Sequence, residues 1–371
     1  MAIGPISSTN PLAGARPVEP VAEPNAVRVV AGRLAALAKA ATGADKPLAP
    51  MTLEAALAKA VTDAVQTAAP RQAGLGRLMA DLAQALASPD LPAPAREAAV
   101  RLLGLRTPLT PALTPTEVKQ AVARSGLFLE ARLAAQPAAD LRLPPDLKAA
   151  LLVAREAFAA WAGSTPPTPA REGAPPPAGA AEPPPPPPFR GGPVAAQPPA
   201  AQPPPAEPHA MARRLVREAE GAVARQELLQ AASLPFTRPA DAAEPPGRTH
   251  WLFEIPFASP QGTAVAQFEV ERDGGGADGG TPGDAPPHWR ARFALDIEPF
   301  GPVQAQVTLS GARAGVQLWA ERNETALALR AHQDLLRGAL ELAAYTPEIA
   351  VTAGAPPRAA PPAGLFLDRS S

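Results

Sequence analysis

The sequence predicts an α+β fold for the C-terminal part of the chain, with a mostly antiparallel sheet and one helix packed on it. Apolar and polar residues alternate in consecutive segments after position 249, which is typical of an antiparallel sheet with one buried face. Upstream, apolar residues recur at helical spacing, and a Pro-rich stretch separates the two regions. The 371 residues include 52 prolines, far above the usual ~5% of positions. We therefore expect modest folded units joined by extended chain.

The expected C-terminal domain covers residues 249–354. Strands are predicted at 250–257, 264–271, 289–297, 303–309, 316–320 and 348–352. A single helix precedes the last strand, with Asn323 as its N-cap and Pro347 beyond its end. Its apolar stripe consists of Leu329, His332, Leu336, Leu340 and Ala343. We expect this domain to fold alone, and residues 355–371 to form a flexible tail.

Residues 26–163 are predicted to form a loose helical region, because the apolar stripes there are thin and rich in Ala. Thr114 and Pro115 open one helix, with Pro at the first helical position and Gly126 just past its end. A separate amphipathic helix is expected at 211–232, within a segment of helix and linker at 209–248. The other helices are expected at 27–41, from the N-cap Thr52 to Pro70, at 74–89 and at 144–161.

The segment 164–208 is predicted to be a Pro-rich linker. It contains the unbroken run Pro183 to Pro188, and proline both fixes φ and removes a backbone donor. Such a segment favours extended polyproline II structure, in which about 45 residues reach roughly 140 Å. Three interpretations stay open at this point: a spacer of set length, a passive linker, or a ligand for a proline-binding domain.

Composition excludes several classes of function. A net charge of -1 offers no basic surface for nucleic acid or for an anionic membrane. The absence of Cys excludes disulfides, thiolate zinc sites and a cysteine nucleophile. No run of about 20 apolar residues is present, so we expect no membrane insertion. Residues 1–25 lack the pattern of a cleaved signal peptide and are expected to be disordered, with a possible export signal.

No pattern in the chain indicates an enzyme, a cofactor site or a metal site. The glycines of 274–283 lack the Lys and Ser or Thr of a phosphate-binding loop, so a flexible hairpin loop is expected. The four histidines are not spaced as metal ligands; His250 is expected to face solvent, and His332 to pack against the sheet. Glu269 and Glu271 lie two apart on one strand, which favours a solvated sheet face over paired catalytic carboxylates.

Two segments resemble the family of bacterial flagellar hook-length control proteins. The first runs from Glu298 to Leu309 and reads EPFGPVQAQVTL, a Pro, a bulky residue and a Gly that lead into an alternating strand. It continues through residues 315–320 and a helix in which Leu335, Leu336 and Arg337 precede Leu340, so that this resemblance covers about residues 250–354. The second, weaker resemblance lies near 125–152, in residues 125–130 and 146–152.

The resemblance implies a role in export. Proteins of this family act as a secreted molecular ruler, and their C-terminal domain switches type III export from hook-type to filament-type substrates. The implied partners are the cytosolic domain of the export-gate switch protein and the hook and hook-cap subunits. The implied location is cytoplasmic before export, followed by secretion through the flagellar apparatus, and we expect a monomer.

The resemblance also places candidate partner-binding residues for the switch. These are Val303 on the strand after the turn, and Leu336, Arg337 and Leu340 on the helix. An ordinary core role for the three apolar residues is the alternative. Two other functions stay open as well: a needle-length regulator of a virulence-type secretion system, and a Pro-rich scaffold that measures nothing.

Overall fold

The computed structural model describes residues 53–135, 145–164, 185–200, 207–234, 249–273 and 287–357. Several predictions lie outside these residues: the disordered segment 1–25, the helix at 27–41, the N-cap Thr52, the glycine-rich loop 274–283 and the tail beyond 357. Among the described helices, none is long and apolar enough to cross a membrane.

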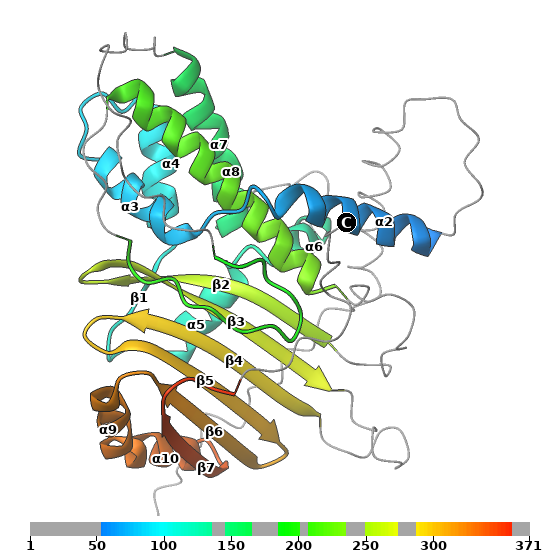
Figure 1. The fold of residues 1–371 in the computed structure, drawn as a ribbon, viewed down its shortest axis with the longest axis vertical. Helices are drawn as coiled ribbons and strands as arrows, with labels where there is room; N and C mark the ends of the chain where they lie inside the picture. Colours follow the sequence, from blue (N-terminus) through cyan, green and yellow to red (C-terminus); the bar gives the residue numbers. More distant parts are fainter. Residues whose placement is uncertain are drawn as a thin grey trace, which may run out of the picture.

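A seven-stranded sheet with its strands in sequence order forms the centre of the structure (Figure 1). Neighbouring strands are antiparallel except for the two outer pairs, in which β1 is parallel to β2 and β6 is parallel to β7. The predicted α+β class is confirmed, and the sheet gains the short first strand from the helical region. The strands are β1 (Thr107–Pro108), β2 (Thr249–Ser259), β3 (Gly262–Asp273), β4 (His288–Ile297), β5 (Gly301–Ser310), β6 (Arg313–Ala320) and β7 (Thr346–Ala353).

Strand register gives the sheet two chemically distinct sides. Phe253 of β2 lies opposite Phe268 of β3, which in turn lies opposite Phe293 of β4. These rings stack with centroids 5.4 and 5.3 Å apart, and we call their side the apolar face. The alternate residues form the polar face, which carries Glu254 and Glu269.

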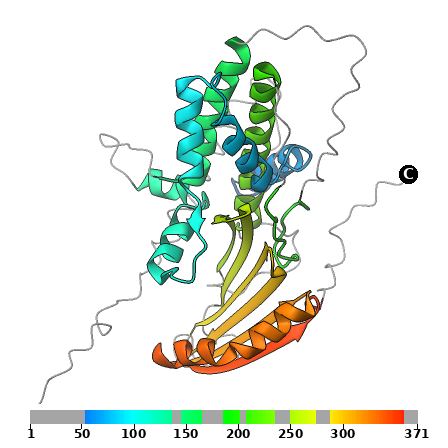
Figure 2. The same ribbon diagram turned by 90° about the vertical axis from the view of Figure 1, so that its left-hand side faces the viewer.

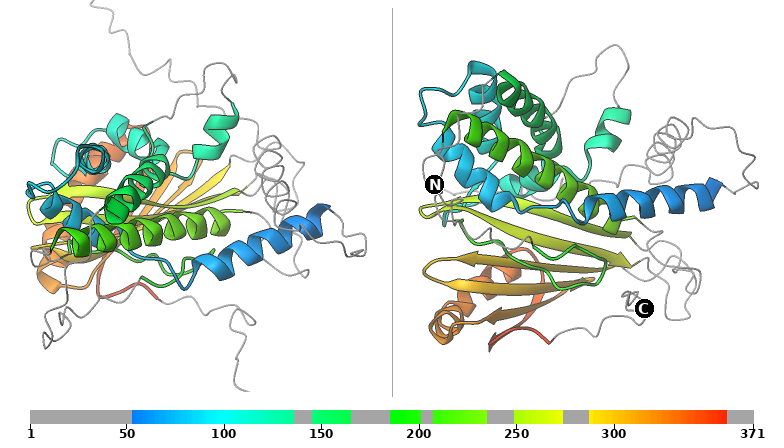
Figure 3. Two further views of the ribbon diagram at one scale, coloured as in Figure 1. Left: turned by 90° about the horizontal axis from the view of Figure 1, so that it is seen from above. Right: turned by 45° about the horizontal axis from the view of Figure 1, so that its top comes forward.

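A helical layer covers the polar face at β2 and β3 (Figures 1 and 3). A buried cluster of Leu, Ala, Phe and Trp side chains joins helices α3, α4, α7 and α8 and includes Val265 of β3. Many members of this cluster are alanines, whose small side chains let the helices approach closely. The helices of this region are α2 (Leu53–Ala68), α3 (Leu75–Ala85), α4 (Ala93–Leu103), α7 (Leu147–Ser164) and α8 (Pro208–Ala232).

Helix α5 (Pro115–Ala123) covers the apolar face near β2 (Figure 2). It begins as predicted, with Pro115 at its start, and Thr114 and Glu117 complete a capping box in which each side chain bonds the other's backbone. Gly126 follows with a φ of +94°, a conformation that favours glycine. The short helix α6 (Leu129–Ala134) was not predicted from the sequence, and neither were α4 and β1.

The prediction of a single helix after β6 is wrong in one respect, because this segment forms two helices. Helix α9 (Asn323–Ala331) ends and α10 (Gln333–Leu342) begins at His332, whose φ of -104° and ψ of 8° interrupt the helix. His332 is exposed, not packed against the sheet, and its Nδ1 lies 2.8 Å from the Ala328 carbonyl. The residue before the helix is Arg322, so Asn323 is the first helical residue instead of the cap.

The described part of the proline-rich linker, residues 185–200, is extended but does not stand free of the fold. It crosses the front of the sheet as a green coil in Figure 1 and forms an antiparallel bridge between Gln197 and Val265 of β3. We call residues 185–200 the proline strap. The remainder of the predicted linker between α7 and α8 lies outside the described residues.

Candidate functional site

The EPFG turn that carries the family resemblance connects β4 to β5 and is fixed by Arg322. The Arg322 guanidinium donates to both Glu298 carboxylate oxygens, at 2.7 and 2.5 Å, and to the Pro299 carbonyl at 2.7 Å. The hydrogen bond from Arg322, and then its charge, hold the pKa of the Glu298 carboxyl below its ordinary value. Thr325 at the start of α9 donates to the Phe300 carbonyl at 2.7 Å. The turn therefore holds the beginning of α9 in place.

Two features of the turn favour glycine at position 301. Its φ is +68°, which L side chains rarely adopt. A Cβ there would also lie 2.5 Å from Arg322 Nε, so any larger residue would displace the guanidinium that fixes the turn. The pattern of Pro, bulky residue and Gly thus positions α9 against the sheet through Arg322.

The four predicted partner-binding residues lie in two places. Val303 is half-buried on the apolar face, paired with Leu295 of β4 and Ala320 of β6. Leu336, Arg337 and Leu340 are half-buried on α10, which packs on β7. Helix α10 packs on β7 and α9, whereas β5 pairs with β4 and β6. The partner-binding role of the four residues stays a prediction.

A row of exposed leucines on α9 and α10 was not predicted as a site. Leu335 and Leu342 are 71% and 88% exposed, and Leu327 is 61% exposed. Leu335 and Leu342 are seven residues apart, which places them on the same side of α10. Large apolar side chains in water are typical of contact surfaces when they cluster. In the sequence, the seven-residue spacing of Leu335 and Leu342, next to the predicted apolar stripe of this helix, was the signal that could have identified them.

The apolar face contains a hollow of about 380 Å³. Its lining comes mostly from β3, β4 and β5, together with Tyr345 before β7. Trp289 stands on this face, stacked on Trp251 with ring centroids 6.1 Å apart. The lining is Val270, Pro287, Trp289, Arg290, Ala291, Val307, Leu309, Gly311 and Tyr345.

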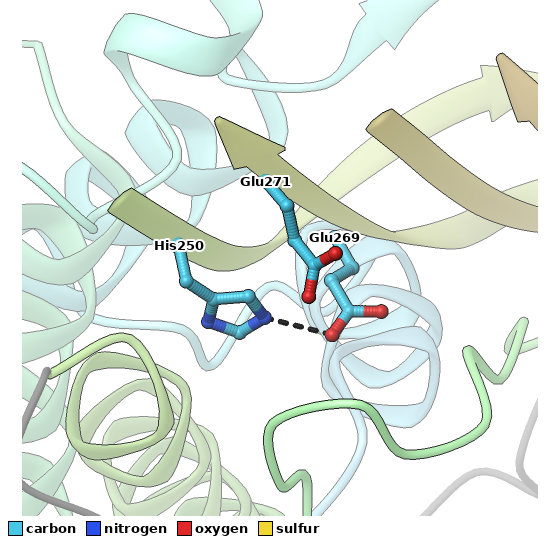
Figure 4. Close-up of side chains that lie close together, drawn as sticks. All are labelled: His250, Glu269 and Glu271. Carbon is cyan, nitrogen blue, oxygen red and sulfur yellow. Dashed lines mark hydrogen bonds and ion pairs between the residues drawn. The ribbon is translucent and has the colours of Figure 1, made fainter. Parts of the chain in front are cut away.

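The polar face contains buried charges that the sequence reading placed in solvent. His250 and Glu269 are buried, with side-chain exposures of 2% and 1%, and His250 Nε2 lies 2.7 Å from Glu269 Oε1 (Figure 4). Arg292 of β4 pairs with the other carboxylate oxygen of Glu269. The expectation of a solvated strand face at Glu269 is therefore wrong, because the strap and helices exclude water from it.

The electrostatics of Glu269 follow from its partners. Burial on its own raises the pKa of this carboxyl, but the hydrogen bond with His250 and the charge of Arg292 outweigh burial and leave the pKa lowered. Glu271 stands close to both, and ligand atoms of His250, Glu269 and Glu271 lie within 4.8 Å of one another. Arg292 already neutralises Glu269, so the group fits an ion-pair network better than a cation site.

A second buried pair joins α8 to β2. Arg225 and Glu254 are both fully buried, and Arg225 donates from Nε and Nη2 to Glu254 Oε1 at 3.0 and 2.8 Å. Arg225 also donates to Gln72 Oε1 at 2.8 Å and to the Pro186 carbonyl at 2.6 Å. The helical region, the strap and the sheet therefore all contact the Arg225 guanidinium.

The two pieces of the weaker resemblance meet in space. Asp146 accepts hydrogen bonds from the backbone of Lys148 and Ala149 at the start of α7. Lys148 then reaches Glu130 and Gln230, both at 2.5 Å. This contact ties the segments 125–130 and 146–152 to α8. The arrangement explains why these residue types occur together but leaves their assignment to a family untested.

Comparison with known protein families gives a match in the C-terminal part of the chain. Residues 277–360 match the family described as flagellar hook-length control protein FliK. No curated protein and no solved structure matches the chain. The match confirms the resemblance found around the EPFG turn, although it begins later than the expected boundary near 250. The part of this chain that carries β4 to β7 with α9 and α10 is therefore similar to the flagellar hook-length control family.

Proposed function

We propose that this protein controls flagellar hook length as a secreted ruler and switches the export apparatus from hook-type to filament-type substrates. The family match at residues 277–360 is the observation that carries the proposal. The order of parts supports it, because a helical region and a proline-rich segment precede the sheet. Extended proline-rich chain supplies reach without collapse, as a ruler requires.

The proposed partners follow from the family. The helical region meets hook and hook-cap subunits during export, and the C-terminal sheet meets the cytosolic domain of the export-gate switch protein. The protein is cytoplasmic until it leaves through the flagellar type III apparatus. Neither step calls for catalysis, so we propose a regulatory role and no enzymatic activity.

We propose that the partner of the sheet meets the surface of α9 and α10. Leu335 and Leu342 are exposed there, and Arg337 lies on the same helix with 39% of its side chain exposed. Arg337 Nε is 3.9 Å from Asp334 Oδ1, and such an exposed pair contributes little stability. Arg337→Glu should therefore fold and be exported, yet give overlong hooks without filaments. Normal filaments with this variant would remove the α10 surface from the contact.

Deletion of the gene followed by electron microscopy of hooks tests the whole proposal. We expect hooks of uncontrolled length and few filaments. A series of deletions and Gly/Ser-free insertions within residues 165–184 then tests the ruler, because this part of the linker lies outside the strap. Hook length should change in proportion to the residues removed or added. Constant hook length across the series would exclude measurement by this segment.

Two rival functions make different predictions. A needle-length regulator of a virulence-type system would have needle genes as neighbours instead of hook genes, and its deletion would leave hooks unchanged. A scaffold that measures nothing would tolerate changes in linker length. The family match favours the flagellar function, since it names hook-length control.

A further inference from the structure

We propose that the polar face at β2–β4 is a binding site for an extended proline-rich segment. The proline strap occupies this site as an intramolecular ligand. Tension on the linker releases the strap from the site. The binding claim does not depend on hook-length control. The claim about tension rests on the proposed function and deepens it.

Backbone hydrogen bonds carry the recognition. Gly191 N donates to Glu269 Oε1 at 2.8 Å, and Ala195 N donates to Gln267 Oε1 at 3.1 Å. Gln197 exchanges two backbone bonds with Val265, at 2.9 and 2.8 Å. Pro193 between these positions, and the prolines at 185–188 and 198–199 on either side, have no N–H to satisfy. An extended chain with donors at these points and prolines around them therefore meets the site without losing hydrogen bonds.

The site exists because β4 pairs with the later part of β3 and leaves the first residues of β3 without a partner on that side. Strand β3 pairs with β4 from Gln267 to Asp273 only, so the backbone of Val265 has no partner in β4. Gln197 of the strap takes that place. Adding an extended segment to a free sheet edge is a common mode of peptide recognition, in which main-chain bonds supply affinity and side-chain pockets supply specificity.

Side chains of the site also depend on the strap. Gln197 Nε2 donates to Glu254 Oε1 at 3.1 Å, and Arg292 donates to the Gly192 carbonyl at 3.1 Å. The Pro186 carbonyl accepts from the buried Arg225. Removing the strap would take hydrogen-bond partners from Glu254, Glu269 and both arginines at once. The site is therefore polar, charged and specific for an extended backbone.

Two glycines of the helical layer, Gly74 and Gly76, allow the strap to approach closely because they have no side chain. A Cβ on Gly74 would lie 2.5 Å from Gln197 Oε1, and a Cβ on Gly76 would lie 3.3 Å from the Pro198 carbonyl. The strap itself turns at Gly191, where φ is +71°. The strap therefore lies in close contact with the beginning of α3, and a larger residue at position 74 would have to displace the Gln197 side chain.

The position of the strap in the chain gives the site a mechanical role. In the chain, the strap lies between the linker residues 165–184 and helix α8, and α7, which precedes the linker, packs on α8. A pull from the N-terminal side therefore reaches the strap once α7 has separated from α8. Release of residues 185–200 would free a segment that spans about 50 Å when fully extended at ~3.1 Å per residue. Release would also take one hydrogen bond from Glu269 on β3, the neighbour of β4, and one from Glu254 on β2.

Binding in trans tests the site. Residues 185–200 are replaced by a Gly/Ser segment of equal length in the full chain, and a fluorescent peptide with the sequence of 185–200 is added. We expect saturable binding by fluorescence anisotropy to the replaced chain, and at least about tenfold weaker binding to the unchanged chain, where the tethered strap competes at an effective concentration near mM. A peptide with the same residues in scrambled order is the control.

Amide hydrogen exchange on the unchanged chain provides the second measurement, which holds even where the replaced chain fails to fold. The amides of Gly191, Ala195 and Gln197 should exchange at least about tenfold more slowly than unstructured amides, because each donates to the sheet. Unprotected strap amides would overturn the proposal, as would equal binding of the native and scrambled peptides. Failure of the hook-length experiments alone would leave both results unchanged and would remove only the role of tension.

Discussion

The two halves of the sheet are stabilised in different ways. Strands β2 and β3 are covered by helices and strap on the polar face and by α5 on the apolar face, and they hold fully buried charges such as Glu254. Strands β5 to β7 have a thinner cover, and no residue of α10 is buried. The family match falls on the thin half. The thin half therefore keeps apolar side chains such as Leu335 and Leu342 on its surface, while the covered half is held by buried charge pairs.

The largest effect is expected from Arg225→Leu in the covered half. The substitution leaves Glu254 buried without its counter-charge, which typically costs about 3–5 kcal/mol. Urea unfolding of the purified chain measures the loss. The double variant Arg225→Leu with Glu254→Leu is the matched control and should recover most of the stability. A single variant as stable as the parent would contradict the view that this half depends on buried charge pairs.

The next effect concerns pH and lies in the helical layer. Burial, and then the neighbouring Asp81 carboxylate, raise the pKa of Glu218 to about 9. A carboxyl with a raised folded-state pKa favours the protonated form, so stability is full below the unfolded pKa near 4.5 and declines as pH rises toward about 9. Glu218→Gln removes the titration and should stabilise the chain at pH 8 by about 1–3 kcal/mol.

Thermal unfolding at pH 6 and pH 8 checks the Glu218 prediction. The difference in Tm between the two pH values should shrink in the Gln variant. Glu97→Gln is a suitable control, since Glu97 pairs with Arg101 on the exposed side of α4 and exposed pairs contribute little. The same pH dependence in Glu218→Gln and in the parent chain would show that Glu218 is not the titrating group.

A moderate effect is expected at the turn that leads into the thin half. Gly301→Ala forces a side chain into a positive φ and displaces Arg322, which should cost about 1–3 kcal/mol. Loss of the bidentate pair with Glu298 should loosen the start of α9. Hydrogen exchange should then rise in α9 and stay unchanged in β2. A uniform rise throughout the sheet would show that the two halves unfold as one unit.

The smallest effect on stability is expected on α10. The double variant Leu335→Ser with Leu342→Ser changes residues that are 71% and 88% exposed, so unfolding should change by less than about 0.5 kcal/mol per site. Filament formation should nevertheless fail if this surface meets the export gate. Leu336→Ser is the contrasting variant, because Leu336 is half-buried and should lose stability as well. Normal filaments in the double variant would remove the exposed leucines from the contact surface.

Most elements of the fold could be predicted from local pattern. The alternation of Trp251, Phe253 and Ile255 fixes both a strand and its buried side, because successive side chains in a strand point to opposite faces. The start of α5 was equally clear, since Thr114, Pro115 and Glu117 satisfy its first amides within a few residues. The domain boundary near 249 stays a prediction, and the contacts of α8 with β2 show that the covered half depends on residues before it.

The sequence by itself determined the classes of element and the resemblance around residues 298–309, because period and turn chemistry are local properties. Only the tertiary structure decided which charges are buried. Glu254 and Arg225 are 29 residues apart, Gln72 and Arg225 are 153 apart, and Gly191 and Glu269 are 78 apart. A glutamate on a strand looks solvated until a distant arginine and backbone amide are placed beside it. The docking of the proline strap has the same physical cause, because prolines fix an extended conformation locally but the free backbone of Val265 that holds the segment is created by the sheet.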